Sequence, residues 1–173
     1  MSLSKTVAIL SDTHGYLNPQ VANVVRNCDF AVHAGDICGK KVLDALKPRT
    51  GKVIAVRGNN DHPFLWSSEE SDTVASLEKV ATVKLPGGEL LVEHGDRWGH
   101  HRPSHEKLRK AHPHVKMIVY GHSHKLIVDQ DEKPWVVNPG AAGKTRTHGG
   151  ASCLVLTAHP DCWEIEAHRF SDH

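Results

Sequence analysis

Short apolar runs, each closed by glycine, aspartate or asparagine, mark the first third of the chain. They are rich in β-branched and aliphatic residues. Continuous apolar runs of this length are typical of strands that are buried on both faces of a parallel sheet. We therefore expect strands at residues 5–11, 30–34 and 52–57.

The segments between these runs predict crossover helices. Asn18-Pro19 places a proline just inside one helix start, and Pro48 stops a second helix. Helices that connect parallel strands form βαβ units. The expected helices lie at 18–27, 40–47 and 73–79.

The rest of the chain differs, because its apolar runs are closely spaced. Turn signals at 86–88 (Pro-Gly-Gly) and at 129–133 predict hairpins, with one helix at 103–112. The expected strands are 80–85, 89–94, 116–120, 125–129, 134–138, 152–158 and 162–169.

A parallel half that faces a more antiparallel half, with helices outside, predicts an α/β fold. Specifically, we expect a four-layer α/β/β/α sandwich of two mixed sheets. No repeat, low-complexity segment or linker interrupts residues 1–173, so we expect a single domain. A chain of 173 residues is long enough to bury a substantial core.

Composition narrows the function classes only a little. The formal net charge of +1 gives no sign of nucleic-acid or membrane binding, although a local basic patch is compatible with it. The four cysteines form no CxxC pair, and neither a signal peptide nor a membrane-spanning run is visible. We therefore expect a cytoplasmic protein with reduced thiols. Histidine is the outlier, with 15 residues, and it is the commonest metal ligand among side chains.

Candidate metal ligands directly follow the predicted strands. Asp12 and His14 come after the first strand, and His122 and His124 follow a later one in the string GHSH. In an extended segment, residues i and i+2 point the same way, so each pair could reach one ion. Taken alone, each residue is equally compatible with a turn or with a partly buried histidine. The full set is Asp12, His14, Asp36, Asn59, His94, His122 and His124, with Asp61 and Asn138 beside it.

The ligand types and their order point to one family. Oxygen and imidazole ligands without thiolate suit a divalent transition metal better than structural zinc or calcium. The strings SDTHG, AGD, GNND, EHGD, GHSH and NPGA resemble the calcineurin-like metallophosphoesterases. More narrowly, they resemble the small single-domain bacterial and archaeal phosphodiesterases of that superfamily, over about residues 5–142.

The resemblance implies a dinuclear metal-dependent phosphoesterase, in the first place a phosphodiesterase. A metal-bridging hydroxide would attack the phosphorus between two ions about 3.5–4 Å apart. Asp36 would bridge the ions, because two dications that close need negative charge between them. The first ion would be held by Asp12, His14 and His124, and the second by Asn59, His94 and His122. Mn²⁺ is the first expectation, with Fe, Zn, Co or Ni as alternatives.

The remaining roles are assigned by position. Asp36, Asn59 and Asp61 are the predicted catalytic residues, Asp61 by orienting Asn59 or a metal-bound water. Asn138 is compatible with supporting the site and equally with an ordinary turn. Asn60 and Arg146 are the predicted substrate-binding residues, Arg146 through a phosphate contact.

One position departs from the family pattern. Many members carry histidine where this chain has Asn60, and an amide donates hydrogen bonds but is no acid near neutral pH. We therefore expect faster turnover of esters with activated leaving groups.

Two other functions stay open. The same fold serves as a non-catalytic interaction subunit, notably the small scaffold protein of the retromer coat, in which the ligand positions have decayed. The same chemistry could also serve a phosphomonoesterase, a nucleotidase or a nuclease. We expect a small phosphate ester as the substrate and neither nucleic acid nor a membrane as a partner, while the oligomeric state cannot be read from the sequence.

Overall fold

The computed structural model describes residues 3–171, and its first sheet is built around parallel strands from the start of the chain. Its strand order is β10-β9-β1-β2-β3. The strands are β1 (Lys5–Leu10), β2 (Phe30–His33), β3 (Lys52–Ala55), β9 (Ala151–Ala158) and β10 (Trp163–Phe170). β1, β2 and β3 run parallel, while β9 pairs antiparallel with both β1 and β10. The end of the chain therefore completes the sheet that its start began.

The second sheet has the order β4-β5-β6-β8-β7. Its strands are β4 (Val80–Leu85), β5 (Gly88–Glu93), β6 (Met117–Val119), β7 (Leu126–Asp129) and β8 (Trp135–Pro139). β5, β6 and β8 are parallel, and only the edge strands β4 and β7 pair antiparallel. The sheet is thus more parallel than its short connections predicted, because the helix between β5 and β6 returns the chain to run in the same direction.

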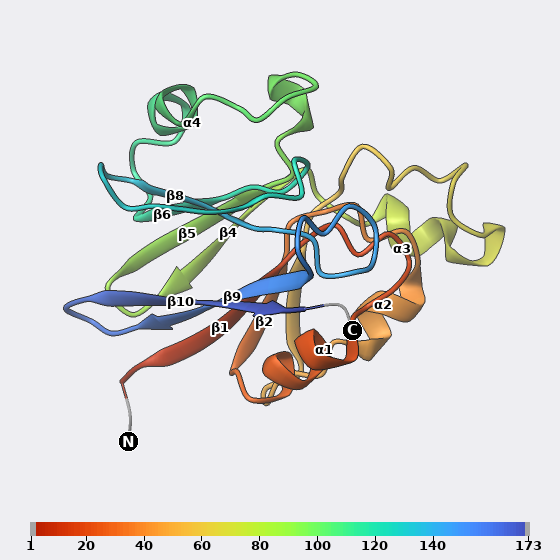
Figure 1. Cartoon of the computed structure of the whole chain (residues 1–173), viewed down its shortest axis with the longest axis horizontal. Coiled ribbons are helices and arrows are strands. Elements are labelled where there is room, and N and C mark those ends of the chain that lie inside the picture. Colours follow the sequence, from red (N-terminus) through yellow and green to blue (C-terminus); the bar gives the residue numbers. More distant parts are fainter. Residues whose placement is uncertain (1–2, 172–173) are drawn as a thin grey trace.

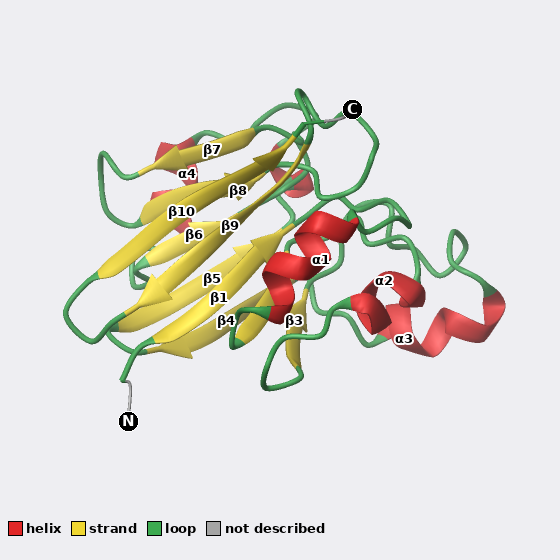
Figure 2. Ribbon diagram, turned by 60° about the horizontal axis from the view of Figure 1, so that its bottom comes forward, coloured by secondary structure: helices red, strands yellow, loops and turns green. Residues whose placement is uncertain are grey.

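The helices cover the outer faces of the two sheets, so the fold is the expected four-layer sandwich (Figure 1). α4 lies outside the second sheet, and α1 lies across β1 and β9 of the first (Figure 2). Asn18 caps α1 as expected, since its Oδ1 accepts the backbone N–H groups of Gln20 and Val21. The helices are α1 (Pro19–Arg26), α2 (Lys40–Ala45), α3 (Ser71–Ala75) and α4 (His105–Ala111), with the 3₁₀ turns η1 (Ser68–Glu70) and η2 (Asp96–Trp98).

The main core lies between the sheets. Alternate residues of β1 face opposite ways: Val7 and Ile9 belong to the cluster shared with the second sheet, and Ala8 and Leu10 to the cluster under α1. This alternation is the period-two pattern of a strand. β1 is buried on both faces, which explains why its sequence reads as one apolar run.

The parallel strands bring their carboxyl ends to one edge of the sandwich. β1, β2 and β3 of the first sheet and β5 and β6 of the second all lead into loops that contact one another there. No helix within residues 3–171 is long and apolar enough to span a membrane.

Candidate metal centre

The loops after β1 and β2 pair with each other through their backbones. The N–H of Asp12 donates to the carbonyl of Gly35 at 3.0 Å, and the N–H of His14 donates to that of Asp36 at 3.0 Å. Any Cβ at Gly35 would meet Nδ1 of His94 at 2.7 Å and the backbone nitrogen of Gly58 at 2.8 Å. Glycine is therefore required where the loops converge.

Five candidate ligands have left-handed backbone conformations, a finding that corrects one premise of the sequence interpretation. Both the Asp-x-His and the His-x-His pairs were expected on extended backbone, but neither is extended. The φ angles are 53° at Asp12, 45° at His14, 53° at Asp36, 65° at His122 and 61° at His124. This region costs about 1–2 kcal/mol for a non-glycine residue, and such strain clusters at functional sites. Tight loops, rather than strand periodicity, bring each pair together.

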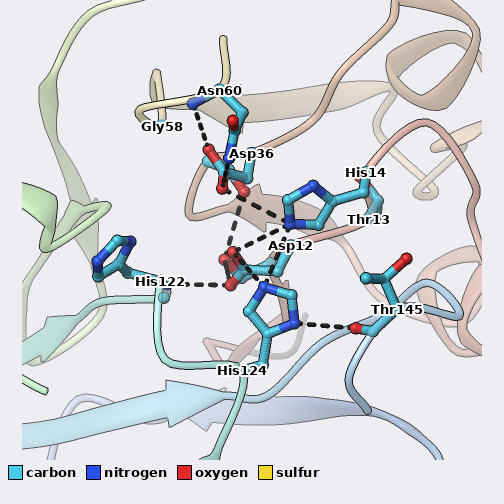
Figure 3. Close-up of polar contacts among 12 residues, drawn as sticks. Asp12, Thr13, His14, Asp36, Gly58, Asn60, His122, His124 and Thr145 are labelled. Carbon is cyan, nitrogen blue, oxygen red and sulfur yellow. Dashed lines mark hydrogen bonds and ion pairs between the residues drawn. The ribbon is translucent and has the colours of Figure 1, made fainter. Parts of the chain in front are cut away.

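Three of the ligand-type atoms form a first group (Figure 3). Oδ1 of Asp12 lies 3.4 Å from Nε2 of His124 and 3.9 Å from Nε2 of His14, and the two Nε2 atoms are 3.2 Å apart. Oδ2 of Asp12 is satisfied by the hydroxyl of Ser11 at 2.7 Å and by the N–H of His122 at 3.1 Å. Oδ1 has no hydrogen-bond donor although it is buried. This oxygen is left to face the two imidazoles.

A second group forms around Asn59. Its side-chain oxygen lies 3.0 Å from Nε2 of His94 and 3.1 Å from Nδ1 of His122. Asp36 stands between the groups: its Oδ2 is 3.6 Å from Nε2 of His14, and its Oδ1 is 3.5 Å from Nε2 of His94. One carboxylate thus faces both groups.

Backbone carbonyls fix the orientation of two imidazoles. Nδ1 of His94 lies 2.8 Å from the carbonyl oxygen of Ala34, and Nδ1 of His124 lies 2.9 Å from that of Thr145. Because a carbonyl can only accept, each Nδ1 carries a proton, so Nε2 is the atom that presents a lone pair to the site whenever the ring is neutral. This is the arrangement of metal-binding histidines.

Burial sets most of the ionisation states. It lowers the pKa of His14 and His122 and lowers that of His124 to about 4, so these rings are neutral at pH 7. Burial also raises the pKa of Asp12 to about 7. Neutral imidazoles with lone pairs and a buried carboxylate oxygen without a hydrogen-bond donor are what a cation requires, so the residues fit a divalent metal.

Asp36 and His94 are the exception to this effect of burial, because the charge of each stabilises the opposite charge of the other. Burial opposes the charge of His94, but Asp36 and Asp12 raise the pKa of its imidazole to about 9. Burial likewise opposes the charge of Asp36, yet His94 and Asn60 hold the pKa of this carboxyl well below its usual range. Without a metal, a proton on His94 supplies the missing positive charge.

Asp61 acts on backbone rather than on the side chain of Asn59. Its carboxylate accepts the N–H groups of Ile37 at 3.0 Å, Cys38 at 2.9 Å and Gly58 at 2.9 Å, and the indole N–H of Trp66 at 3.2 Å. It is 1% exposed. Asp61 therefore joins the loop that carries Asp36 to the loop that carries Asn59.

Asn138 supports the GHSH loop. Its amide donates to the carbonyl of Gly121 at 2.9 Å and to the hydroxyl of Ser123 at 3.0 Å, and its side-chain oxygen accepts from Gly140 at 2.9 Å. It is fully buried. The side chain of Asn138 thus stabilises both its own turn and the loop that carries His122 and His124.

The two predicted substrate residues border the site. The amide of Asn60 donates to Oδ2 of Asp36 at 2.8 Å, and the exposed Arg146 donates from Nη2 to Nε2 of His124 at 3.2 Å. A guanidinium therefore stands at the first group, on a loop whose backbone at Arg146 has a φ of 49°.

Several supporting residues were not predicted. Sγ of Cys38 lies 3.9 Å from Nδ1 of His14, and the buried His33 lies 3.0 Å from the hydroxyl of Thr13. Thr145 and Ala34 act through carbonyl oxygens, which any residue supplies, so no sequence signal exists for them. Cys38 follows Asp36 by two residues, and this spacing is the only signal that could have identified it.

Comparison with known proteins finds similar sequences. Residues 6–161 match the model of the calcineurin-like phosphoesterase superfamily domain. A probable metallophosphoesterase of Methanocaldococcus jannaschii is 29% identical over 144 residues, which are 78% of this chain and 67% of that protein. A phosphodiesterase of the same archaeon is 24% identical over 142 residues, 78% of this chain and 82% of that protein.

Solved structures share the fold at low identity. The structure of an archaeal phosphodiesterase superposes with a TM-score of 0.68 at 20% identity, covering 94% of this chain and 99% of its own. Vps29 from Entamoeba histolytica, complexed with Zn²⁺, has a TM-score of 0.69 at 18% identity, with 96% and 98% covered. A phosphodiesterase and Vps29 thus share the architecture of this chain.

Proposed function

Because this chain belongs to the calcineurin-like phosphoesterase superfamily, we propose that it is a dinuclear metal-dependent phosphodiesterase of small phosphate esters. The observation that carries the proposal is the buried Oδ1 of Asp12, which has no donor and faces two imidazole nitrogens. A buried carboxylate with a purely structural role would have a hydrogen-bond donor for each oxygen, since an unpaired buried polar atom costs about 1–3 kcal/mol.

The two groups of ligand atoms would each hold one divalent ion, and Asp36 faces both. Bound there, the ions would supply Lewis-acid polarisation of the phosphoryl group and lower the pKa of water. Mn²⁺ is the metal we propose first, because three of the seven proposed ligands are oxygen donors and none is a thiolate. Zn²⁺ is the nearest alternative, and Vps29, whose fold this chain shares, has been solved with that ion.

The protein's own residues would bind and orient the ester. Asn59 is exposed at the rim, while Asp12 and Asp36 lie at the floor of the site. Arg146 can pair with a non-bridging phosphoryl oxygen from the side of His124. Asn60 is occupied at Asp36, so the leaving group would depart without a protein acid at this position.

A second function, that of an interaction scaffold, is favoured by the likeness to Vps29. The set of candidate ligands argues against this function. A protein that only binds partners has no need of seven metal-ligating side chains gathered in two groups. The phosphodiesterase is therefore the first proposal.

Metal-stripped protein assayed with Mn²⁺, Zn²⁺, Co²⁺ and Ni²⁺ tests the proposal. We expect hydrolysis of bis(4-nitrophenyl) phosphate that depends on added metal and exceeds hydrolysis of 4-nitrophenyl phosphate. Asp36→Asn should lower kcat by at least about a hundredfold, since it removes the charge between the ions.

Asp44→Asn is the matched control, because Asp44 is exposed and its pair with Lys40 lies at the surface. It should keep wild-type activity. Absence of turnover with every metal, or equal turnover by Asp36→Asn and wild type, would refute the proposed enzymatic activity. The interaction scaffold would then be the remaining proposal. A preference for the monoester would leave the metal centre standing and replace the diesterase with a monoesterase.

A further inference from the structure

His33 ends β2 beside the candidate metal centre, although it is not one of the candidate ligands. Its side chain is fully buried, and burial lowers the pKa of its imidazole to about 3, so the ring is neutral at pH 7. The backbone N–H of Gly35 donates to Nδ1 at 3.1 Å. Because Nδ1 accepts, the proton of the ring is on Nε2, which lies 3.0 Å from the hydroxyl oxygen of Thr13. His33 therefore donates to Thr13.

Thr13 continues these hydrogen bonds to the loop of Asp36. Its hydroxyl oxygen accepts from His33, so the hydroxyl proton is available to the carbonyl oxygen of Ile37, which lies 3.1 Å away. Thr13 is only 1% exposed. Gly35 and Ile37 are the two neighbours of Asp36 in the chain. The hydrogen bonds thus run from one neighbour of Asp36, through His33 and Thr13, to the other.

Thr13 lies between two candidate ligands on a strained loop. Asp12 and His14 have φ angles of 53° and 45°, and Asp36 on the facing loop has a φ of 53°. Residues with a side chain rarely adopt this left-handed conformation, and it persists only where the surrounding contacts over-determine it. Backbone hydrogen bonds also join the two loops, but any sequence could form them. The hydroxyl of Thr13 and the ring of His33 are the contacts that depend on particular side chains.

We propose that His33 is a positioning residue of the metal centre, which acts through the hydroxyl of Thr13 on the ligands of the first group. A fixed Thr13 holds Asp12 and His14 on its two sides at a constant distance from Asp36. This inference rests on the proposed function, because it assumes the metal centre. Within residues 3–171, the side-chain hydrogen bonds of His33 and Thr13 end on the neighbours of Asp36. The ion of the second group should therefore be affected less.

Variants of Thr13 test the inference by metal binding, which requires no hydrolysis. Metal-stripped protein is titrated with Co²⁺ in a calorimeter, and His14→Ala and His122→Ala assign the binding steps, because each removes one ligand from one group. Thr13→Val removes the hydroxyl at nearly constant shape. It should weaken binding of the first-group ion about 10–100-fold, the usual effect of losing a contact that supports a metal ligand. Thr13→Ser keeps the hydroxyl and should restore the affinity.

Two substitutions of His33 separate the roles of its two nitrogens. His33→Gln places an amide N–H near the position of Nε2 and can still donate to Thr13, whereas the shorter side chain of His33→Asn can serve only Gly35. We expect His33→Gln to retain more of the affinity for the first-group ion than His33→Asn does. The reverse order would show that the contact with Gly35 carries the effect, and it would overturn the inference.

Thr6→Val is the matched control, since Thr6 has a similar arrangement near the other end of β1. Its hydroxyl accepts from the backbone N–H of Asp29 at 3.0 Å and donates to the carboxylate of Asp29 at 3.1 Å. Like Thr13→Val, this variant should lower the free energy of unfolding in urea, but it should leave both metal affinities at their wild-type values. Equal weakening of both ions by Thr13→Val, or the same weakening by Thr6→Val, would reduce His33 to a structural residue.

An NMR measurement on the metal-free protein tests the hydrogen bonds directly. With ¹⁵N-labelled histidine, Nε2 of His33 should carry a proton that exchanges slowly with solvent and Nδ1 should carry none, and the exchange should be faster in Thr13→Val. A proton on Nδ1 would refute the inference. If Thr13→Val weakens the first-group ion but the wild type hydrolyses no ester, the diesterase is refuted and the role of His33 stands. A wild type that binds no metal would refute both.

Discussion

The side-chain amide of Asn60 donates a hydrogen bond of 2.8 Å to Oδ2 of Asp36, and the backbone N–H of Asn60 donates to Oδ1 at 2.9 Å. One residue therefore orients both oxygens of the carboxylate that faces both groups of candidate ligands. The position that holds histidine in many superfamily members is used here to fix Asp36.

The first prediction follows from this orientation. Asn60→Ala removes the side-chain hydrogen bond and keeps the backbone one, so Asp36 gains rotational freedom. Support of this kind for a metal ligand is worth about 10–100-fold in metal affinity. Calorimetric titration of the stripped protein with Mn²⁺ should show that loss. Asn23→Ala, at an exposed position of α1, serves as the control, and an unchanged affinity of Asn60→Ala would contradict the assigned role.

The second prediction concerns the leaving group. Asn60→His introduces a group that can donate a proton near neutral pH. Rates measured on a series of aryl methyl phosphates should then depend less steeply on the pKa of the departing phenol than in the wild type. The variant should gain most on the poorest leaving groups. A parallel loss across the whole series would show that the role of Asn60 at Asp36 outweighs any gain from an acid.

The fold could be predicted because its strands are buried on both faces. The apolar runs at 5–11 and 30–34 appear as β1 and β2, and the proline signals at 19 and 48 mark the limits of α1 and α2. The parallel pairing of β5, β6 and β8 was missed, because strand direction depends on how far α4 carries the chain and not on local composition.

The site could be predicted in its residue types but not in its backbone. Asp12 and His14 were identified from their place after β1, yet they meet through left-handed loop geometry that the sequence does not encode in a short pattern. The partners of His94 and His124 are carbonyl oxygens of Ala34 and Thr145, which have no side-chain signature. The types of the candidate ligands could therefore be predicted from the sequence, whereas the hydrogen bonds that orient their side chains are seen only in the structure.

A third prediction separates Asp61 from the indole that it binds. Asp61→Ala leaves the N–H groups of Ile37, Cys38 and Gly58 without their acceptor, and the bonds from Ile37 and Gly58 are buried. The free energy of unfolding should therefore fall by at least about 3 kcal/mol. Trp66→Phe removes only one donor to the carboxylate and should cost about 1–2 kcal/mol. Urea unfolding of both variants measures the difference. If both variants lost a similar free energy of unfolding, Asp61 would stabilise the fold mainly through its hydrogen bond with Trp66 and not through the backbone N–H groups.

The fourth prediction concerns the thiol beside His14. Nδ1 of His14 has Cys38 Sγ as its neighbour at 3.9 Å, and Sγ donates to the carbonyl of Asn60 at 4.0 Å. Burial raises the pKa of the Cys38 thiol to about 12, so it stays protonated and its sulfur can accept from His14. Cys38→Ala should weaken the affinity for one of two bound ions while Cys38→Ser retains more of it. Stepwise titration with Co²⁺, followed by its visible absorption, distinguishes these outcomes from an equal loss at both ions.

The last prediction is a fall in stability of the metal-free protein as the pH rises. Both the pKa of Asp12, at about 7, and the pKa of His94, at about 9, lie above their ordinary values. At these two groups the folded state binds more protons than the unfolded state, and the stability that these protons provide is lost as pH rises through the folded pKa values. His14, His122 and His124, whose pKa values are lowered, act in the opposite direction up to about pH 6.5, so the net fall begins above that pH. In chelator, the melting temperature should fall between about pH 7 and pH 9, and most of this fall should be missing in His94→Gln. Added metal replaces the proton, so its stabilising effect should grow over the same range. A melting temperature that is constant across this range in chelator would show that neither group retains its proton in the folded protein.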